Sequence, residues 1–289
     1  MNTGLIGLGA MGEGMARNLA KAGYLTGVYN RSAEKANNLA AALDLCGFQT
    51  ISELAASVDV LLTCVSEDSD VLEVINAAAP YLKSGSVVVD CSTVSADTAR
   101  AAAHLLARYD VHFLDAPVSG GVEGARQGTL AMMVGGDAKV LERVTPVLSA
   151  IATRISHMGD TGAGQATKAV NQIMAAGINQ AVTEALSFAQ ALDLPMDKVI
   201  DVVSGGAAGN WFLEHRGPSM SQGRFAPGFK LQLHAKDLRI CRAMADSKSI
   251  ALPLTAQTLD DYQRLIEQGF GDEDISALFR LKAALSAHA

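Results

Sequence analysis

The sequence lacks the features that mark several classes of protein. No run of Lys and Arg occurs along its 289 residues, and the formal net charge is -7 at pH 7. A negatively charged chain without a basic run is poorly suited to nucleic acid or to an anionic membrane surface, because both partners are polyanions. We therefore expect neither as a partner, although a local basic pocket for a small phosphate is compatible with this charge.

Cysteine and metal-binding patterns are also scarce. The four cysteines form no Cys-x-x-Cys pair and lie far apart, at Cys46, Cys64, Cys91 and Cys241. Three of them stand in apolar, strand-like segments, so we expect buried thiols in a reducing compartment rather than disulfides. Histidines such as His157 and His234 have no partners at metal-ligand spacing, and no metal site is expected.

No hydrophobic run is long enough for a membrane span. The longest uncharged run, residues 169–183, contains four amide side chains and falls short of the ~18–20 apolar residues required. The first predicted strand begins near residue 3, which leaves no room for a basic signal-peptide region, and we expect a cytoplasmic protein. A hydrophobic content of 49% can instead supply the cores of two domains.

In the first part of the chain, apolar strand-like segments alternate with helical ones. Strands are predicted at residues 3–6, 25–29, 48–51, 58–64, 86–91 and 111–114, then one ending at 135–136 and a short one near 154–157. Helices are predicted between them, for example at 33–43, 70–79 and 137–150. This alternation is typical of a doubly wound α/β sheet of Rossmann type, and we assign it to a domain of residues 1–161.

From Gly162 onward the pattern is helical only. A long helix is predicted at about residues 163–192, followed by helices at 196–204, 211–220, 231–246, 252–268 and 275–287. We therefore expect an all-α C-terminal domain, residues 162–289, which begins with the long helix that joins the two domains.

A glycine-rich turn follows the first predicted strand. Its residues are Gly7, Leu8, Gly9, Ala10, Met11 and Gly12, and a helical pattern begins immediately after them. In such a turn the first glycine allows the tight bend, the second lets a pyrophosphate approach the backbone, and the third permits close packing of helix on strand. The helix N-terminus faces the anion. We expect a dinucleotide cofactor here.

The second predicted strand ends in Asn30, Arg31 and Ser32, where NAD-binding folds usually place a carboxylate. A neutral residue followed by arginine suits a ribose 2′-phosphate, so NADP(H) is expected in preference to NAD(H). Ligands of doubly wound sheets lie beyond the carboxyl ends of the strands, which makes Val65 and Thr93 candidate cofactor neighbours.

A second polar cluster follows the strand at residues 111–114. Ser119, Gly120 and Gly121 could hold a carboxylate through a hydroxyl and closely spaced backbone N–H groups, or they could form a turn without a ligand.

On the long helix, Lys168, Gln172 and Asn179 fall within about 40° of one another. They lie opposite an apolar stripe that is expected to face the core. This stripe comprises Val170, Ile173, Met174, Gly177, Ile178, Ala181, Val182, Ala185 and Ala189.

Four motifs together resemble the β-hydroxyacid dehydrogenase family, which includes 3-hydroxyisobutyrate dehydrogenases and tartronate semialdehyde reductases. They span residues 7–12, 115–121, 162–168 and 236–238. The resemblance covers essentially the whole chain. It implies a Rossmann-type domain, an interdomain helix, and a helical domain that packs across subunits in a homodimer or homotetramer.

The resemblance also implies site residues. Lys168 would be the general acid/base, residues 119–121 would bind the substrate carboxylate, and Thr93 would neighbour cofactor or substrate. The C-terminal domain would contribute Phe229, Lys236 and Asp237. Many members have Asn four residues after the lysine, but this chain has Asn171 and Gln172, so the orienting amide is left open between them. Trp211 is either a wall of the pocket or part of the packing at a helix start.

The predicted function is NADP(H)-dependent interconversion of a short β-hydroxyacid and its semialdehyde. The substrate would be of the tartronate semialdehyde, glyoxylate, succinic semialdehyde or 3-hydroxyisobutyrate type, and the direction is left open. One alternative is an imine reductase, although similar imine reductases usually carry Asp or Tyr in place of Lys168. The other is a dinucleotide-binding interaction protein without catalysis.

Overall fold

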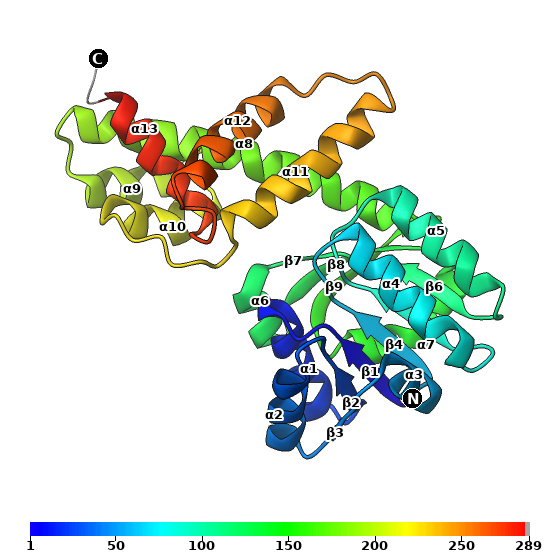
Figure 1. Ribbon diagram of the computed structural model, residues 1–289. Coiled ribbons are helices and arrows are strands. Elements are labelled where there is room, and N and C mark those ends of the chain that lie inside the picture. The colour runs from blue at the N-terminus through cyan, green and yellow to red at the C-terminus, as the bar shows by residue number, and fades with distance from the viewer. Residues whose placement is uncertain (287–289) are drawn as a thin grey trace. The chain divides into compact units, whose positions relative to one another are not determined.

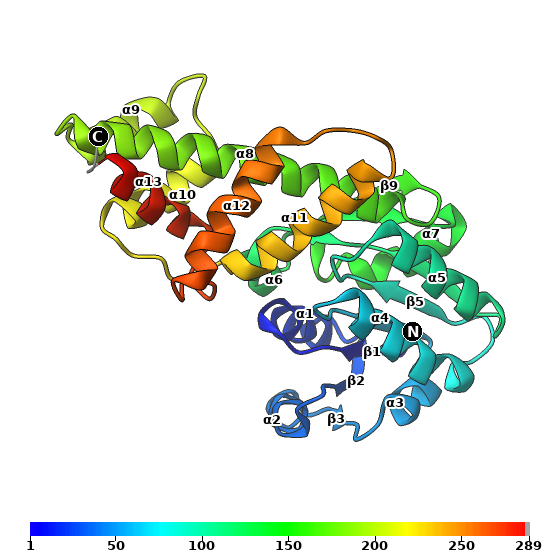
Figure 2. The same ribbon diagram turned by 45° about the horizontal axis from the view of Figure 1, so that its top comes forward.

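The computed structural model describes residues 1–286 and contains two compact units, Met1–Lys168 and Ala169–Ala289. The division falls within one long helix, α8 (Ala163–Ala191), whose first six residues belong to the first unit. Figures 1 and 2 show the strands in the first unit and only helices after residue 168. The predicted fold class is confirmed.

The first unit is built on one sheet with strand order β3-β2-β1-β4-β5-β6-β8-β7, and β9 pairs with β8. The strands are β1 (Thr3–Ile6), β2 (Leu25–Tyr29), β3 (Cys46–Gly47), β4 (Val60–Thr63), β5 (Val87–Asp90), β6 (His112–Asp115), β7 (Val118–Ser119), β8 (Leu130–Gly135) and β9 (Ala152–Gly159). The pairs from β3 through β6 are parallel, and β8 runs antiparallel to β6. The order reverses between β1 and β4, which is where dinucleotides bind in such sheets.

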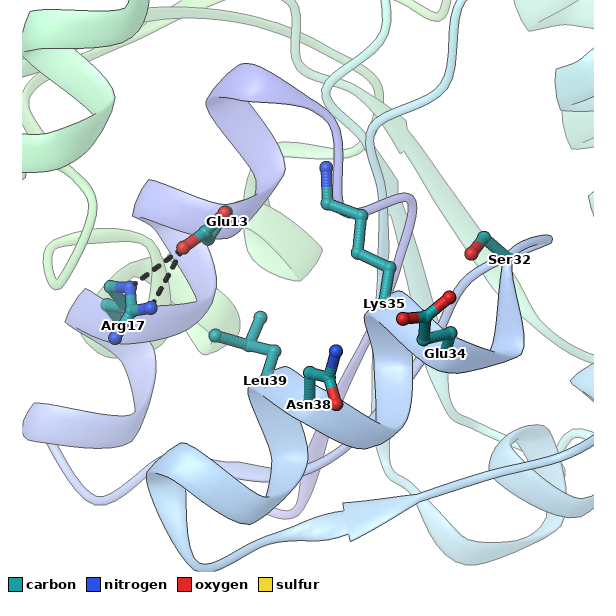
Figure 3. A pocket seen from close by; sticks show the side chains of 7 residues that line it. All are labelled: Glu13, Arg17, Ser32, Glu34, Lys35, Asn38 and Leu39. Carbon is teal, nitrogen blue, oxygen red and sulfur yellow. Dashed lines mark hydrogen bonds and ion pairs between the residues drawn. The ribbon is translucent and has the colours of Figure 1, made fainter.

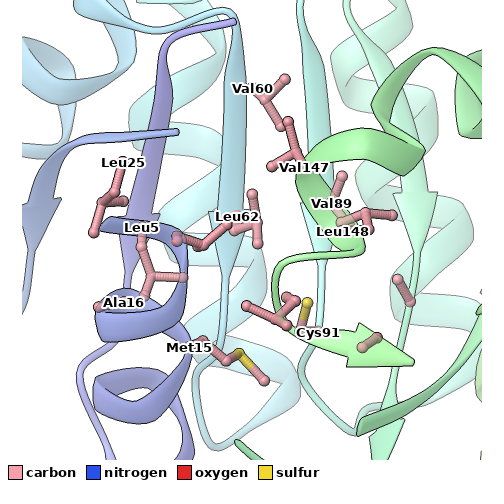
Figure 4. Packing of buried hydrophobic residues seen from close by; sticks show 14 of the residues in the cluster. Leu5, Met15, Ala16, Leu25, Val60, Leu62, Val89, Cys91, Val147 and Leu148 are labelled. Atoms are coloured by element: carbon pink, nitrogen blue, oxygen red, sulfur yellow. The ribbon is translucent and has the colours of Figure 1, made fainter. Parts of the chain in front are cut away.

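Helices cover both faces of this sheet. They are α1 (Ala10–Lys21), α2 (Ala33–Leu43), α3 (Ile51–Ser57), α4 (Asp68–Ala78), α5 (Ala96–Ala107), α6 (Gly121–Gln127) and α7 (Ala138–Leu148), with a 3-10 turn at Ala79–Tyr81. Consecutive residues of a strand belong to separate hydrophobic clusters on the two faces of the sheet. Leu5 packs with Leu62 and Met15 on one face (Figure 4), whereas Ile6 packs on the other. Burial on both faces explains why these strands are continuously apolar.

The second unit contains the rest of α8 and the helices α9 (Met196–Ser204), α10 (Trp211–Ser221), α11 (Leu231–Asp246), α12 (Pro253–Glu267) and α13 (Leu278–Ser286), with a 3-10 turn at Ile275–Ala277. Leu186, Phe212, Leu238 and Tyr262 lie in its core. The helix predicted at 275–287 begins in the structure as the 3-10 turn at Ile275–Ala277 and continues as α13. Its predicted last residue lies outside the described residues. No helix within residues 1–286 is long and apolar enough to cross a membrane.

Three local predictions in the first unit differ from the structure. The third strand is β3 at residues 46–47 rather than 48–51, because Thr50 and Glu53 form a capping box that starts α3 at Ile51. The short strand β7 and the helix α6 were not predicted. Cys46 is exposed, contrary to the expected burial, because it lies in the two-residue edge strand β3.

The predicted orientation of α8 is wrong over much of its length. Val170 and Met174 leave 57% and 62% of their surfaces exposed, whereas Gln172 and Asn179 are buried. The buried amides have internal partners: Asn179 donates to the Tyr262 hydroxyl at 2.8 Å and to the backbone carbonyl of Ile275 at 2.9 Å. These hydrogen bonds satisfy Nδ2 and offset part of the cost of burying the amide, whose Oδ1 has no hydrogen-bond partner in the described part of the chain.

Candidate active site

The glycine-rich turn connects β1 to α1 and has the geometry that its sequence predicts. Gly7 has φ +94°, and a Cβ added there would overlap with the carbonyl oxygen of Cys64. A Cβ on Gly12 would overlap with the carbonyl oxygen of Gly7. Around Gly9, by contrast, no atom lies within 4 Å of an added Cβ. The protein's own packing thus requires Gly7 and Gly12, and Gly9 leaves the space that a pyrophosphate would need.

Asn30 supports this turn. Its Oδ1 accepts a hydrogen bond from the backbone N–H of Leu8 at 2.9 Å, and its Nδ2 donates to the carbonyl of Ser32 at 3.3 Å. Asn30 therefore joins the end of β2 to the glycine turn. Sequence reasoning proposed it as a cofactor contact and missed this structural role, because its partner lies 22 residues away.

Arg31 and Ser32 lie exposed at the start of α2, and 88% of the Arg31 side chain is exposed. Its Nη1 lies 3.6 Å from Oδ1 of Asp70. A pocket beside Ser32 extends between α1 and α2, and Figure 3 shows its lining side chains, which include Lys35. Sequence reasoning missed Lys35, although it lies in the first turn of α2, four residues after Arg31.

The carboxyl ends of β4 and β5 are tied together. The backbone N–H of Val65 donates to Oγ of Ser92 at 2.9 Å, and Thr63 donates to Asp90 at 2.7 Å. Ser92 thus has a structural role in the turn, while Thr93 follows it at the edge where ligands of such sheets bind.

Residues 119–121 form a sharp turn between β7 and α6. Gly120 and Gly121 have φ values of +131° and +61°, a region that favours glycine. Ser119 ends β7 and is partly buried. The turn therefore places Ser119 directly before the start of α6 in the chain, and a serine hydroxyl together with backbone N–H groups at such a start can bind a small anion.

Lys168 lies in the second turn of α8 and is 7% exposed. The start of this helix is held by the carboxylate of Asp115, the last residue of β6, which accepts from the backbone N–H groups of Gly162 at 2.7 Å and Gln165 at 2.9 Å. Burial raises the pKa of Asp115, and these two hydrogen bonds oppose the shift. Lys168 therefore projects from a helix start that is fixed at the carboxyl edge of the sheet.

The second unit holds a connected set of polar side chains. Asn171 donates to Oε1 of Gln172 at 2.8 Å, and Nε2 of Gln172 donates to Oδ2 of Asp237 at 2.6 Å. Oδ1 of Asp237 lies 2.9 Å from the ammonium of Lys236. Gln172 is therefore held at both ends of its amide, and Asp237 bridges it to Lys236.

The two predicted aromatic site residues differ in environment. Phe229 is partly buried, its ring lies 5.3 Å from that of His234, and its N–H donates to Asp274 at 3.0 Å. Trp211 begins α10, is 58% exposed, and stacks on His215 with ring centroids 4.3 Å apart. Its described contacts are with His215 and with Arg216 of the same helix. Within residues 1–286 no cluster of three His, Cys, Asp or Glu side chains could hold a metal.

Comparison with known proteins matches both parts of the chain. Residues 2–159 match a family described as the NAD binding domain of 6-phosphogluconate dehydrogenase, and residues 162–282 match one described as NAD-binding of NADP-dependent 3-hydroxyisobutyrate dehydrogenase.

Full-length relatives agree with these matches. The 2-hydroxy-3-oxopropionate reductase of Escherichia coli K12 is 35% identical, with 100% of this chain and 99% of the relative covered. An NAD-dependent L-serine dehydrogenase of Pseudomonas aeruginosa is 32% identical, with 96% of each covered. The solved structure of Mycobacterium tuberculosis 3-hydroxyisobutyrate dehydrogenase with L-serine superposes with a TM-score of 0.88 at 32% identity, covering 97% of this chain and 98% of the other.

Proposed function

Since the chain belongs to the 3-hydroxyisobutyrate dehydrogenase, or β-hydroxyacid dehydrogenase, family of oxidoreductases, we propose that it interconverts a short β-hydroxyacid and its semialdehyde with NADP(H). The observation that carries this proposal is the placement of Lys168. This buried lysine stands one turn beyond a helix start that is bonded to the end of β6, on the sheet edge that also carries the glycine turn.

A bound dinucleotide would supply or accept hydride at its nicotinamide ring. In the reducing direction, the substrate carbonyl oxygen gains negative charge as hydride arrives, and the Lys168 ammonium donates a proton to it. In the oxidising direction, the neutral amine takes the proton from the hydroxyl. General acid–base catalysis of this kind contributes on the order of 10²–10⁴-fold. Ser119 and the backbone N–H groups at Gly120 and Gly121 would hold the carboxylate.

A preference for NADP(H) is the second part of the proposal. Arg31 and Lys35 bring two cations to the segment that follows β2, and Ser32 adds a hydroxyl. A 2′-phosphate can pair with both cations, whereas a ribose hydroxyl gains little from them. Asp70 beside Arg31 acts against the preference, and the relative from Pseudomonas aeruginosa uses NAD.

The substrate class follows from the relatives and from the site. Their names point to small hydroxyacids and their aldehydes. We assign the orienting amide to the Asn171–Gln172 pair, because these side chains bond to each other and Asp237 holds Gln172 in place. The family roles of Lys236, Asp237 and Phe229 as cofactor or substrate neighbours are carried over as part of the proposal.

The test is a panel of substrates assayed with both dinucleotides. Tartronate semialdehyde, glyoxylate and succinic semialdehyde are offered with NADPH or NADH, and 3-hydroxyisobutyrate with NADP⁺ or NAD⁺. We expect turnover of at least one substrate and a higher kcat/KM with the phosphorylated cofactor. Dinucleotide binding without turnover of any substrate would favour an interaction protein, and turnover of cyclic imines alone would favour an imine reductase.

We also propose that the chain forms a homo-oligomer through α8. Its exposed apolar residues recur at helical spacing, at Val170, Met174, Ile178 and Phe188. Exposed apolar stripes of this length are characteristic of protein interfaces.

A further inference from the structure

The first turn of α8 contains a glutamine that is only 1% exposed, Gln165. Its Nε2 donates to the backbone carbonyl of Ser92 at 2.8 Å, and its Oε1 accepts from the backbone N–H of Val94 at 3.1 Å. The two ends of one amide thus bond to the backbone on either side of Thr93. The partners lie 71 and 73 residues away along the chain, so these bonds fix tertiary geometry rather than a local turn.

The backbone of the same helical turn is fixed as well. The N–H of Gln165 donates to Asp115, and a Cβ added at Gly164 would collide with the carbonyl oxygens of Met133 and Asp115. The start of α8 is therefore packed directly against the backbone of β6 and β8. A side chain on such a rigid turn can hold another segment in a defined position.

The segment that Gln165 holds is also connected to the cofactor side of the sheet. Ser92 accepts from the N–H of Val65, and its own N–H donates to Oδ1 of Asp90 at 3.2 Å. Residues 92–94 therefore lie between two anchors, the end of β4 and the first turn of α8. The second of these anchors, the first turn of α8, also carries Lys168, which follows Gln165 by three residues on the same helix.

We propose that Gln165 is a positioning residue that holds Thr93 in register with Lys168. The proposal rests on the proposed catalytic role of Lys168. The site requires an amide because it presents one buried donor and one buried acceptor, and glutamine satisfies both. Methionine would fill a similar volume and satisfy neither.

A double-mutant cycle tests this role. We expect Gln165→Met to lower kcat at least tenfold while the Kd for NADPH changes less than threefold. If Gln165 sets the position of Thr93, the fold loss in kcat/KM caused by Thr93→Val should depend on the background. We expect this loss to be at least threefold smaller in the Gln165→Met variant than in the wild type. Additive effects of the two changes would overturn the proposal.

The matched control is Gln180→Met. Gln180 is a second buried glutamine of α8, and it bonds to Thr258 and Asp261 instead. Its replacement should show additivity with Thr93→Val, so that a coupling of equal size would overturn the proposal. If Gln165→Met does not fold, Gln165→Glu serves in its place. It keeps an acceptor for Val94, loses the donor to Ser92, and should show the same coupling at smaller magnitude.

A measurement without substrate separates this proposal from the proposed function. Hydrogen exchange of the peptide that contains Val94 should be faster in Gln165→Met and unchanged in Gln180→Met. If the wild type is active and exchange is unchanged in Gln165→Met, the proposed role of Gln165 is overturned and the proposed function stands. A wild type that turns over no substrate, with faster exchange in Gln165→Met, would contradict the proposed function but leave the contact itself established.

Discussion

At the scale of single residues, the proposed chemistry depends on Lys168. Lysine is rarely buried unless its ammonium has partners or a function, and Lys168 lies in the second turn of a helix whose start is bonded to the sheet. Removing the ammonium would delete the proposed proton donor and leave the glycine turn between β1 and α1 intact.

We expect Lys168→Ala to retain NADPH binding and to lose on the order of 10²–10⁴-fold in kcat. Steady-state kinetics together with a fluorescence titration of NADPH would show this separation. Lys198→Ala, an exposed lysine of α9, provides the control and should behave as the wild type. An unchanged kcat in Lys168→Ala would remove this residue from the mechanism.

Arg31 and Lys35 should determine the choice of dinucleotide. Each charge-assisted hydrogen bond to a phosphate is worth roughly 1.5–3 kcal/mol, or about 10–100-fold in Kd. Arg31→Ala and Lys35→Ala should therefore weaken NADPH binding by that factor and NADH binding by much less. Lys139→Ala, on the distant helix α7, is the control. Equal losses for both dinucleotides would contradict the phosphate contact.

The cysteines should differ sharply in reactivity. Cys46 is exposed, whereas burial raises the pKa of Cys64 to about 12 and raises that of Cys91 as well. Because the thiolate is the reactive form, Cys46 should be alkylated rapidly at pH 9, and the buried Cys91 should remain a thiol until the protein unfolds. Mass spectrometry after timed labelling checks this order. Rapid native labelling of Cys91 would contradict its buried environment.

At the scale of elements, the glycine turn offers a direct test of its two kinds of glycine. Gly9 has φ -63° and no neighbour near an added Cβ, so Gly9→Ala should fold with an unchanged Tm and bind NADPH at least tenfold more weakly. Gly12→Ala would push against the carbonyl of Gly7 and should lower both the Tm and the affinity. Tight NADPH binding by Gly9→Ala would argue against a pyrophosphate at this turn.

The glycine turn and α8 also show what could be predicted from sequence. The turn was predicted correctly because its determinants lie within six consecutive residues and act through local backbone geometry. The inward face of α8 was predicted wrongly, because helical periodicity identifies an apolar face without showing what covers it. Asn179 is buried through Tyr262, 83 residues away. Gln165 was overlooked for the same reason, since its partners are backbone atoms far along the chain.

At the scale of the whole molecule, the exposed stripe of α8 predicts assembly. We expect Met174→Glu to shift the protein toward monomers, because a carboxylate in an apolar interface is costly to desolvate. Sedimentation velocity measures the change. Gln190→Glu adds the same charge at another exposed position of α8, about 160° around the helix, and should leave the assembly intact. A wild type that is monomeric at micromolar concentration would contradict the proposed interface.

The way α8 is anchored has a consequence for recombination between relatives. The two family matches meet just before this helix, between residues 159 and 162, yet the groups that fix its first turn are Asp115 and the backbone around Ser92. A chimera joined at that boundary would take Lys168 from one parent and its supports from the other. A chimera with its junction after Lys168 would take Lys168, Asp115 and Gln165 from the same parent. Exchange of substrate specificity between family members should therefore succeed more often at a junction inside the helix than at the loop that precedes it.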